Sequence, residues 1–359
     1  MDPPTPPLFR DPLASPSSKA LDLDEPVRAT DNDAALARLS AVRKGYLVDP
    51  FIIHFVPRAH LQPPRPPLIN IGTYIRGTGL DELVESFIGL ATGQGKKAQI
   101  VSLGAGSDTR FWRLHAGTSR EHLACYIELD FPENTTRKAM AVRKSKVLSA
   151  ALGRSEDIQI GDGGTSLHSS IYRLLPLDLR LPPSVSLAPK LAPILDPSSP
   201  LLILCECVLA YVASAASDAV LRWFADFSSS NDGVTGVIIY EMFGLEDSFG
   251  RVMKNNLKSR HVELPGAEPY NSLDSLRQRF FRLGFEEARA LTLRDFRRTH
   301  ISVTEQMRIA RIEMLDEVEE LELVLQHYAI SWGIKLSAKQ ANAWLEWGIA
   351  EKSDEDWIP

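Results

Sequence analysis

The chain has 359 residues, of which 44% are hydrophobic, and its formal net charge is −6 at neutral pH. This length and hydrophobic content suit one large globular domain. The acidic balance argues against a protein that binds nucleic acids or membrane surfaces, because both classes usually carry a basic excess. The three cysteines, Cys125, Cys205 and Cys207, are too few for a disulfide scaffold and lack the spacing of a zinc site, so we expect no metal.

The first twenty residues, MDPPTPPLFRDPLASPSSKA, are too rich in proline and polar residues for a signal peptide. The most apolar stretch, residues 201–216, is too short to cross a bilayer and contains Glu206. We therefore expect a cytoplasmic protein, with the nucleus as an additional location. We also expect a monomer.

Three segments precede the first expected strand. Residues 1 to about 28 are rich in proline and serine and predict a disordered lead-in. Residues 29–92 predict a helical N-terminal part, which starts with a helical pattern from Asp31 to Leu39. A proline-rich loop beginning at Leu61 follows. The last part is an amphipathic helix with one apolar face, formed by Leu80, Leu83, Val84, Phe87, Ile88 and Ala91.

Residues 93–340 alternate apolar runs with helical patterns. The runs are AQIVSLGAG, LACYIELDF, SLHSSIYRLLPLDLR, PLLILCECVLAYV and TGVIIYEMF. Continuous rather than alternating apolar character is typical of strands buried on both faces of a parallel sheet. Helices are predicted at 134–150 and 217–227, and a helix followed by a closing strand from about Tyr328 ends the pattern.

The pattern as a whole predicts one doubly wound α/β domain, in which ligands bind at the carboxyl ends of the strands where the strand order reverses. Residues 181–200 are proline-rich and predict a surface loop, and residues 341–359 predict a C-terminal tail. The first helix after the second run carries several basic residues, which predict a solvated helix face rather than a docking surface: Arg137, Lys138, Arg143, Lys144 and Lys146.

The turn after the first run reads Gly104-Ala105-Gly106-Ser107-Asp108-Thr109. A dinucleotide fingerprint would have a third glycine at Thr109, and no Gly-Lys-Ser/Thr follows to make a P-loop. Asp130 ends the next run, where a carboxylate can accept the hydroxyls of an unphosphorylated ribose. Asp108 beside the turn disfavours a pyrophosphate. Together these residues favour S-adenosylmethionine over NAD.

Two further acids stand at expected strand ends. Glu206 interrupts a buried run, where a lone carboxylate costs several kcal/mol unless it is paired or faces a cavity. We favour a ligand contact for Glu206 over an internal salt bridge. Asp178 can accept from an adenine amino group while the N–H of Leu179 donates to a ring nitrogen, and a local turn made by a loop aspartate is an equal alternative.

These motifs resemble the leucine carboxyl methyltransferases. The likeness is carried by LGAGSDTRFWRL, IELDFPENTTRKAM, ECVLAYV and IIYEMFG, and it extends from about residue 31 to about residue 335. That family methylates the C-terminal leucine carboxylate of the protein phosphatase 2A catalytic subunit with S-adenosylmethionine. Its fold is the class I methyltransferase fold with a helical N-terminal lid, so the resemblance implies this fold, cofactor and partner.

The resemblance also implies roles for individual residues. Gly104 would line the methionine part of the cofactor, Asp130 would hold the ribose, Asp178 and Leu179 would flank the adenine, and Glu206 would contact the cofactor. Two arginines come from the N-terminal part. Arg38 matches a basic residue near the cofactor carboxylate, where many members have lysine. Arg76 matches the arginine that meets carboxylate in the pocket, although Asn-Ile-Gly replaces the family's Asn-Arg-Gly just before it.

The chemistry implied by this resemblance needs no general base. An α-carboxyl group has a pKa of about 3.5, so the nucleophile is already ionised at neutral pH. We expect Arg76 both to contact the cofactor and to orient the substrate carboxylate, and Tyr211 either to add a hydrogen bond or to be a core residue. The alternatives are methylation of another carboxylate, such as that of a modified tRNA base, and a non-catalytic phosphatase-binding protein. An NAD-dependent dehydrogenase is disfavoured by Thr109.

Overall fold

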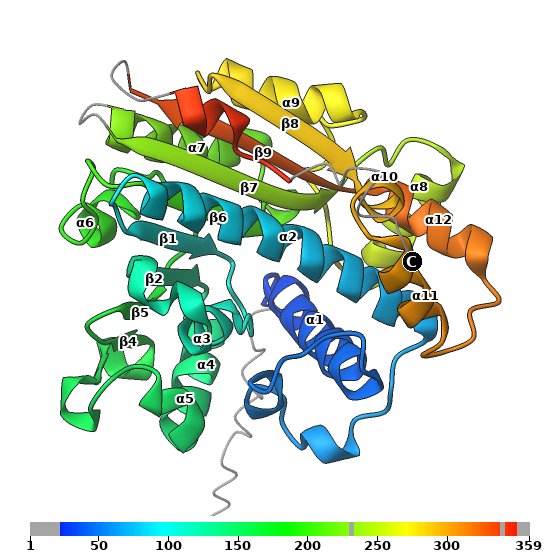
Figure 1. The fold of residues 1–359 in the computed structure, drawn as a ribbon, viewed down its shortest axis with the longest axis horizontal. Coiled ribbons are helices and arrows are strands. Elements are labelled where there is room, and N and C mark those ends of the chain that lie inside the picture. The colour runs from blue at the N-terminus through cyan, green and yellow to red at the C-terminus, as the bar shows by residue number, and fades with distance from the viewer. Residues whose placement is uncertain (1–21, 230–232, 338–341, 350–359) are drawn as a thin grey trace, which may run out of the picture.

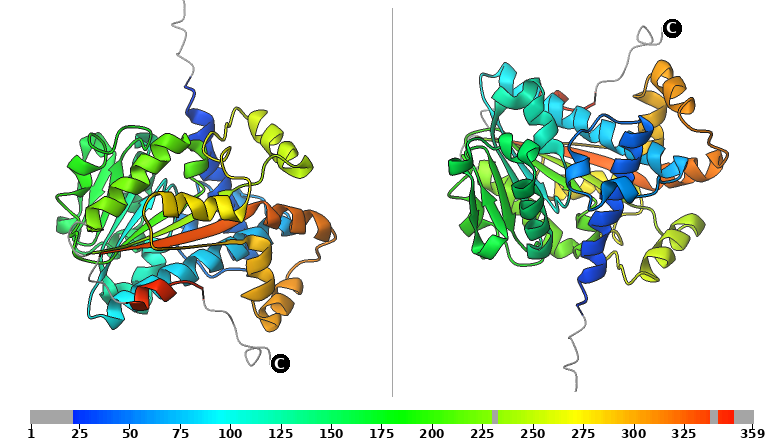
Figure 2. Two further views of the ribbon diagram at one scale, coloured as in Figure 1. Left: turned by 90° about the horizontal axis from the view of Figure 1, so that it is seen from above. Right: turned by 90° about the horizontal axis from the view of Figure 1, so that it is seen from below.

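The computed structural model describes residues 22–229, 233–337 and 342–349, and within them it has a nine-stranded sheet with helices on both faces (Figures 1 and 2). Its helices are α1 (Glu25–Lys44), α2 (Pro67–Gly93), α3 (Arg110–Ala116), α4 (Pro132–Lys144), α5 (Lys146–Ala150), α6 (Ala188–Leu191), α7 (Ser214–Ser229), α8 (Ser248–Lys258), α9 (Leu273–Arg282), α10 (Leu293–Thr299), α11 (Val303–Ala310) and α12 (Val318–Gln326). Its strands are β1 (Ala98–Leu103), β2 (Leu123–Asp130), β3 (Gln159–Gly161), β4 (Ser166–His168), β5 (Tyr172–Pro176), β6 (Leu201–Glu206), β7 (Val234–Met242), β8 (Glu287–Thr292) and β9 (Tyr328–Leu336).

The strands lie in the order β3-β4-β5-β2-β1-β6-β7-β9-β8. The five central strands, from β5 to β7, are parallel, while β9 is antiparallel to both of its neighbours. From β1 the chain first builds one side of the sheet through β2 and β5, and then returns to add β6 on the other side of β1. The strand order therefore reverses at β1, which confirms the predicted doubly wound α/β domain.

The central strands are buried on both faces, as their continuous apolar runs predict. Along β1, Ile100 packs into the core on one side of the sheet and Val101 and Leu103 into the core on the other, all with no exposed surface. The same alternation holds in β6, where Leu202 and Ile203 face opposite cores. Helix α2 packs against β1 and β7 on the first face, and α7 packs against β7.

Helix α2 is longer than the sequence predicts. The expected loop from Leu61 ends early, because the helix begins at Pro67 and continues through Leu80 to Gly93. Proline is well tolerated in the first helical turn, where its missing N–H has no helical partner. This correction places Arg76 on a rigid helix that packs on the sheet. Figure 1 shows α2, in cyan, crossing the face of the sheet.

Helix α1 begins at Glu25, so the predicted disordered lead-in is wrong for residues 25–28, and residues 1–21 lie outside the described residues. Pro26 sits in the first turn of this helix, as Pro67 does in α2. The predicted helix at 134–150 is two helices, because Ser145 is extended and caps α5 through the N–H of Leu148. In Figure 1, α1 lies just beyond the carboxyl end of β1.

Two predicted surface segments contribute to the core. The proline-rich residues 181–200 contain α6, and Leu187 and Leu191 have no exposed surface. In the predicted tail, Trp344 and Trp347 are 0% and 3% exposed, and their rings lie 4.9 Å and 5.2 Å from that of Phe87. Within the described ranges, no helix combines the length and apolar character needed to cross a membrane.

Candidate functional site

The glycine turn after β1 brings the backbone close to two other segments. Gly104 and Gly106 have φ of +63° and +43°, in the left-handed region that favours glycine. A Cβ atom on Gly104 would lie 2.4 Å from Cγ2 of Val208, and one on Gly106 would lie 2.3 Å from Oδ1 of Asp31. The two glycines therefore allow a close approach that any side chain would prevent.

Asp130 stands at the carboxyl end of β2 and faces this turn. Its Oδ2 accepts from the N–H of Gly106 at 2.7 Å, while Oδ1 accepts from the N–H of Phe131 at 2.6 Å and from Nδ2 of Asn134 at 2.8 Å. Burial raises the pKa of Asp130, although these hydrogen bonds oppose the shift. A carboxylate has about four acceptor positions, so the observed contacts leave room for about one ligand hydroxyl rather than the two that the sequence suggests.

A second carboxylate reaches the turn from α1. Asp31 accepts from the N–H of Ser107 through Oδ1 at 2.6 Å and from its hydroxyl through Oδ2 at 3.0 Å. This contact joins the N-terminal helix to the glycine turn. Sequence reasoning missed it, since Asp31 and Ser107 lie 76 positions apart.

Glu206, the last residue of β6, lies beside α2. Its Oε1 accepts from Nε of Arg76 at 2.5 Å, and the Arg76 guanidinium also lies 4.7 Å from the centre of the Tyr240 ring. Burial alone would raise the pKa of Glu206, but the guanidinium groups of Arg76 and Arg110 hold it below its ordinary value. Glu206 is thus an ionised carboxylate. It forms the internal salt bridge that the sequence left as the alternative, and it also lines the cavity described below.

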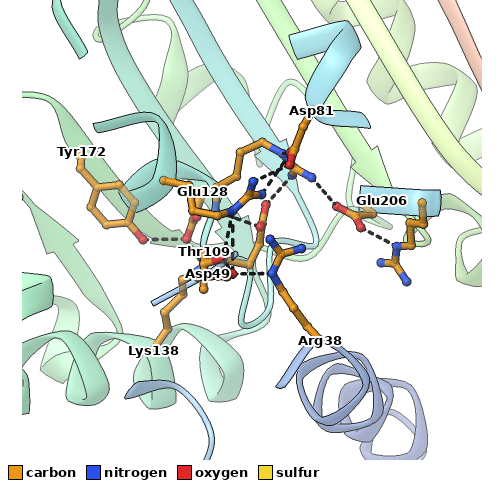
Figure 3. Close-up of polar contacts among 12 residues, drawn as sticks. Arg38, Asp49, Asp81, Thr109, Glu128, Lys138, Tyr172 and Glu206 are labelled. Atoms are coloured by element: carbon orange, nitrogen blue, oxygen red, sulfur yellow. Dashed lines mark hydrogen bonds and ion pairs between the residues drawn. The ribbon is translucent and has the colours of Figure 1, made fainter. Parts of the chain in front are cut away.

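Arg110 is the central cation of this cluster, and sequence reasoning missed it. Only 2% of it is exposed, and its guanidinium donates to Asp81 at 3.0 Å, Asp108 at 2.6 Å and Glu206 at 3.2 Å. Asp108 is therefore neutralised by a neighbour rather than free to repel a pyrophosphate. Figure 3 labels two partners of Arg110, Asp81 of α2 and Glu206 at the end of β6.

Asp49 connects the N-terminal part to the glycine turn. Its Oδ2 accepts from Nε of Arg38 and from the hydroxyl of Thr109, both at 2.5 Å (Figure 3). The Arg38 contact uses only Nε, so the remaining guanidinium N–H groups can serve a ligand. Thr109, which occupies the position of the missing third glycine, has its hydroxyl committed to this buried carboxylate.

The prediction of a solvated basic face on α4 is wrong for Lys138. The other four basic residues of that run are exposed, but Lys138 is 3% exposed and its ammonium group lies 2.5 Å from Oε2 of Glu128. It also donates to the carbonyl of Asp108 at 2.8 Å, and the Tyr172 hydroxyl donates to Glu128 at 2.6 Å. Burial raises the pKa of Glu128 to about 7. This cluster supports the glycine turn through the carbonyl of Asp108.

A cavity of about 620 Å³ opens at this edge of the sheet. That volume lies in the range of small-molecule sites. Six of the predicted site residues line it, and they come from α1, α2, the carboxyl ends of β1, β2 and β6, and the helical turn Leu209–Tyr211 that follows β6: Arg38, Arg76, Gly104, Asp130, Glu206 and Tyr211. The structure thus brings these six positions together, whereas the cavity lining does not include Asp178 or Leu179.

Asp178 makes contacts outside the cavity lining. It accepts from the N–H and the guanidinium of Arg180, and Arg180 also donates to Asp24 next to α1 at 2.7 Å and 2.8 Å. The local turn considered in the sequence is therefore present. The adenine contact of Asp178 and Leu179 stays a prediction.

The described lining of the cavity offers no histidine that could act as a base at neutral pH. Burial raises the pKa of both Tyr211 and Cys207, so both stay protonated. Tyr211 also interacts with the side chains of Thr30 and Cys207. Across the described ranges, no group of three or more potential ligands could hold a metal.

Known proteins match the chain over most of its length. The sequence profile of the leucine carboxyl methyltransferase family matches residues 2–225. The chain belongs to this family. Leucine carboxyl methyltransferase 1 of Cryptococcus neoformans is 41% identical, with 87% of this chain and 94% of the relative covered. The proteins of that name from Emericella nidulans and Schizosaccharomyces pombe are 38% and 34% identical, with 91% and 85% of this chain and 90% and 93% of those relatives covered.

Membership identifies the chain as an S-adenosylmethionine-dependent methyltransferase. Its sheet is that of a class I methyltransferase, with the cavity at the reversal of strand order as such folds require. The predicted family and fold are confirmed. The roles of the individual site residues stay predictions, although the positions and contacts of these residues are now described.

Proposed function

We propose that this leucine carboxyl methyltransferase esterifies the α-carboxylate of the C-terminal leucine of the protein phosphatase 2A catalytic subunit, and so regulates assembly of the phosphatase holoenzyme. The observation that carries the proposal is the position of Arg76. Its Nε is held by Glu206, which leaves both Nη groups to bind a carboxylate in the cavity. A rigid helix positions this guanidinium at the carboxyl ends of the strands.

The cavity fits S-adenosylmethionine. The glycine turn offers backbone that a Cβ atom would block, and Asp130 retains an acceptor position for a ribose hydroxyl. Arg38 would bind the cofactor carboxylate through the N–H groups that Asp49 does not use. When bound, this cofactor supplies a methyl group on a sulfonium, which a carboxylate oxygen can attack directly.

The residues around the cavity suit a reaction in which the nucleophile needs no deprotonation. A C-terminal carboxylate is ionised at neutral pH, and the neutral Tyr211 and Cys207 would not compete with it as nucleophiles. Arg76 would bind one carboxylate oxygen and leave the other free to attack. Its charge is largely offset by Glu206, so it orients the carboxylate without strongly reducing its nucleophilicity.

Besides an oriented carboxylate, the proposed methyl transfer requires that water be excluded from the reacting atoms. The reaction cancels a negative and a positive charge, so a polar solvent stabilises the separated reactants more than the transition state. Helix α1 lies over the glycine turn and is held there by Asp31, and it supplies part of the cavity lining. We infer that α1 is the lid that shields the reacting atoms.

The deciding experiment incubates the purified chain with methyl-labelled S-adenosylmethionine and phosphatase catalytic subunit. One sample has the intact subunit and the matched control lacks only the final leucine. We expect label on the intact subunit alone, and its release by mild base, as for an ester. Equal labelling of both subunits, or base-stable label, would overturn the proposal.

A further inference from the structure

Side-chain carboxylates of the protein itself accept hydrogen bonds from the backbone of the glycine turn. In dinucleotide-binding folds, the backbone N–H groups of the corresponding turn bind a pyrophosphate. Here the N–H of Gly106 donates to Asp130 and the N–H of Ser107 donates to Asp31. Two consecutive donors that could bind a phosphate are thus taken by side-chain carboxylates.

Asp31 is held closely in this position. It uses both oxygens on Ser107, and its side chain is 16% exposed. Gly106 is required for this approach, because a Cβ atom there would lie 2.3 Å from Oδ1 of Asp31. Arg137, the cation that pairs with Asp31, is 3.8 Å away and 56% exposed, so it offsets little of the negative charge.

Asp31 also lines the cavity. Asp31, Gly106, Ser107 and Asp130 all line it, and the Asp31 charge contributes to raising the pKa of Asp130. The arginines of the cavity lining are paired with other carboxylates: Arg28 with Asp22, Arg38 with Asp49, Arg65 and Arg260 with Asp33, and Arg76 with Glu206. A ligand at the glycine turn therefore meets two adjacent carboxylates, which repel a phosphate and attract a cation.

We propose that Asp31 is a specificity-determining residue of the cofactor site. Its carboxylate takes the place of a ligand phosphate on the glycine turn, which excludes nucleoside phosphates and favours a cationic sulfonium nucleoside over the neutral product. Because Asp31 belongs to α1, the same contact makes this selection depend on the position of α1 over the glycine turn. The inference rests on the proposed cofactor and goes beyond it by naming the residue that selects its charge.

Calorimetry on the full chain tests the proposal with three probes: S-adenosylmethionine, S-adenosylhomocysteine and ADP. Asp31→Asn removes the charge but keeps an oxygen that can accept from Ser107. Asp31→Ala also frees the N–H. The matched control is Glu25→Gln, which removes the same charge from the same helix at an exposed position outside the cavity lining.

We expect Asp31→Asn to reduce the preference for S-adenosylmethionine over S-adenosylhomocysteine by at least about threefold. We expect Asp31→Ala to bind ADP at least about tenfold more tightly than the wild type does. The control should keep the wild-type preference. Equal weakening of both nucleosides in the two Asp31 variants, with no gain in ADP affinity, would overturn the proposal and leave Asp31 a lid contact only.

The outcomes separate this inference from the proposed function. A wild-type chain that binds none of the nucleosides contradicts the proposed cofactor. A wild-type chain that binds S-adenosylmethionine, together with variants of unchanged selectivity, contradicts the role of Asp31 alone. If Asp31→Ala does not fold, Asp31→Asn still decides, since it preserves the hydrogen-bond acceptor.

Discussion

Nε of Arg76 lies 2.5 Å from Oε1 of Glu206, although the two residues are 130 positions apart in the chain. This ion pair joins the helix that covers the sheet to the carboxyl end of the strand beside β1. It places a guanidinium and a carboxylate side by side on the wall of one cavity. We predict that Arg76 binds the substrate carboxylate and that Glu206 contacts the cofactor, so this ion pair would join the two binding sites.

Replacement of Arg76 tests its role in the reaction. We expect Arg76→Ala to reduce kcat at least about a hundredfold, because charge-assisted hydrogen bonds to a carboxylate are strong and fix its orientation toward the methyl group. The cofactor Kd should change much less, by under about tenfold. Arg76→Lys keeps the charge but loses the planar geometry, so an intermediate rate is expected. Single-turnover methyl transfer measures the rate, and near-normal turnover in Arg76→Ala would remove it from the mechanism.

Asp130 should determine cofactor affinity. We expect Asp130→Ala to raise the Kd for S-adenosylmethionine at least about tenfold, since it removes an acceptor for the ribose and releases the Gly106 N–H. Calorimetry measures the Kd. Glu133→Ala is a suitable control, because Glu133 is a nearby exposed acid with a side chain that is 57% accessible. An unchanged Kd in Asp130→Ala would refute the ribose contact.

The glycine turn should tolerate no side chain at Gly104. A methyl group there would lie 2.4 Å from Val208 at a φ of +63°, so we expect Gly104→Ala to lower the free energy of unfolding by about 1–3 kcal/mol and to abolish cofactor binding. Gly89→Ala is the matched control in α2. Nothing lies within 4 Å of its added methyl group, and it should stabilise the helix by about 0.5–1 kcal/mol. Denaturant unfolding distinguishes the two.

Glu128 should make stability fall as pH rises. Burial raises its pKa from an ordinary value of 4.5 to about 7 in the folded protein. The folded state then holds a proton that the unfolded state has already released, so the free energy of unfolding falls between about pH 4.5 and pH 7. Glu128→Gln should therefore gain stability relative to the wild type over this range.

Unfolding in urea at several pH values measures this difference. Tyr172→Phe provides a second check, because the Tyr172 hydroxyl lowers the pKa of Glu128 and its loss should extend the fall to higher pH. A difference between wild type and Glu128→Gln that stays constant with pH, or has the opposite slope, contradicts the prediction.

The segment at 342–349 should contribute to stability of the whole domain. Trp344 is fully buried against Phe87, and the indole N–H of Trp347 donates to the carbonyl of Leu83 at 3.1 Å. We expect Trp344→Ala to cost about 3–5 kcal/mol. Trp223→Ala on α7, whose ring is partly buried, should cost less. Equal losses measured by chemical denaturation would contradict the core position of Trp344.

The strands of this fold could be predicted from sequence because burial on both faces leaves a continuous apolar run, as in β1 and β6. The first residues of the helices were harder to predict. The prolines before Leu68 suggested a loop, yet Pro67 is well suited to the first turn of α2. Trp344 and Leu191 were placed outside the core because short segments carry too few residues to show a period.

The site was predictable where a residue stands at a strand end, as Asp130 and Glu206 do. Its long-range contacts were not, because the Asp31–Ser107 hydrogen bond and the Arg110–Glu206 ion pair join residues 76 and 96 positions apart. No local pattern encodes such partners. Arg110 could have drawn attention as a cation directly after an acidic glycine turn, and Lys138 could have been separated from its run by its position on the inner face of α4.

The position of β9 has a consequence during synthesis. This strand, at residues 328–336, lies between β7 and β8, which are made earlier. A nascent chain still attached to the ribosome must therefore keep the facing edges of β7 and β8 unpaired until β9 emerges. Such edges pair readily with other chains. Premature termination before Tyr328 would thus leave a species prone to aggregation rather than a smaller folded enzyme.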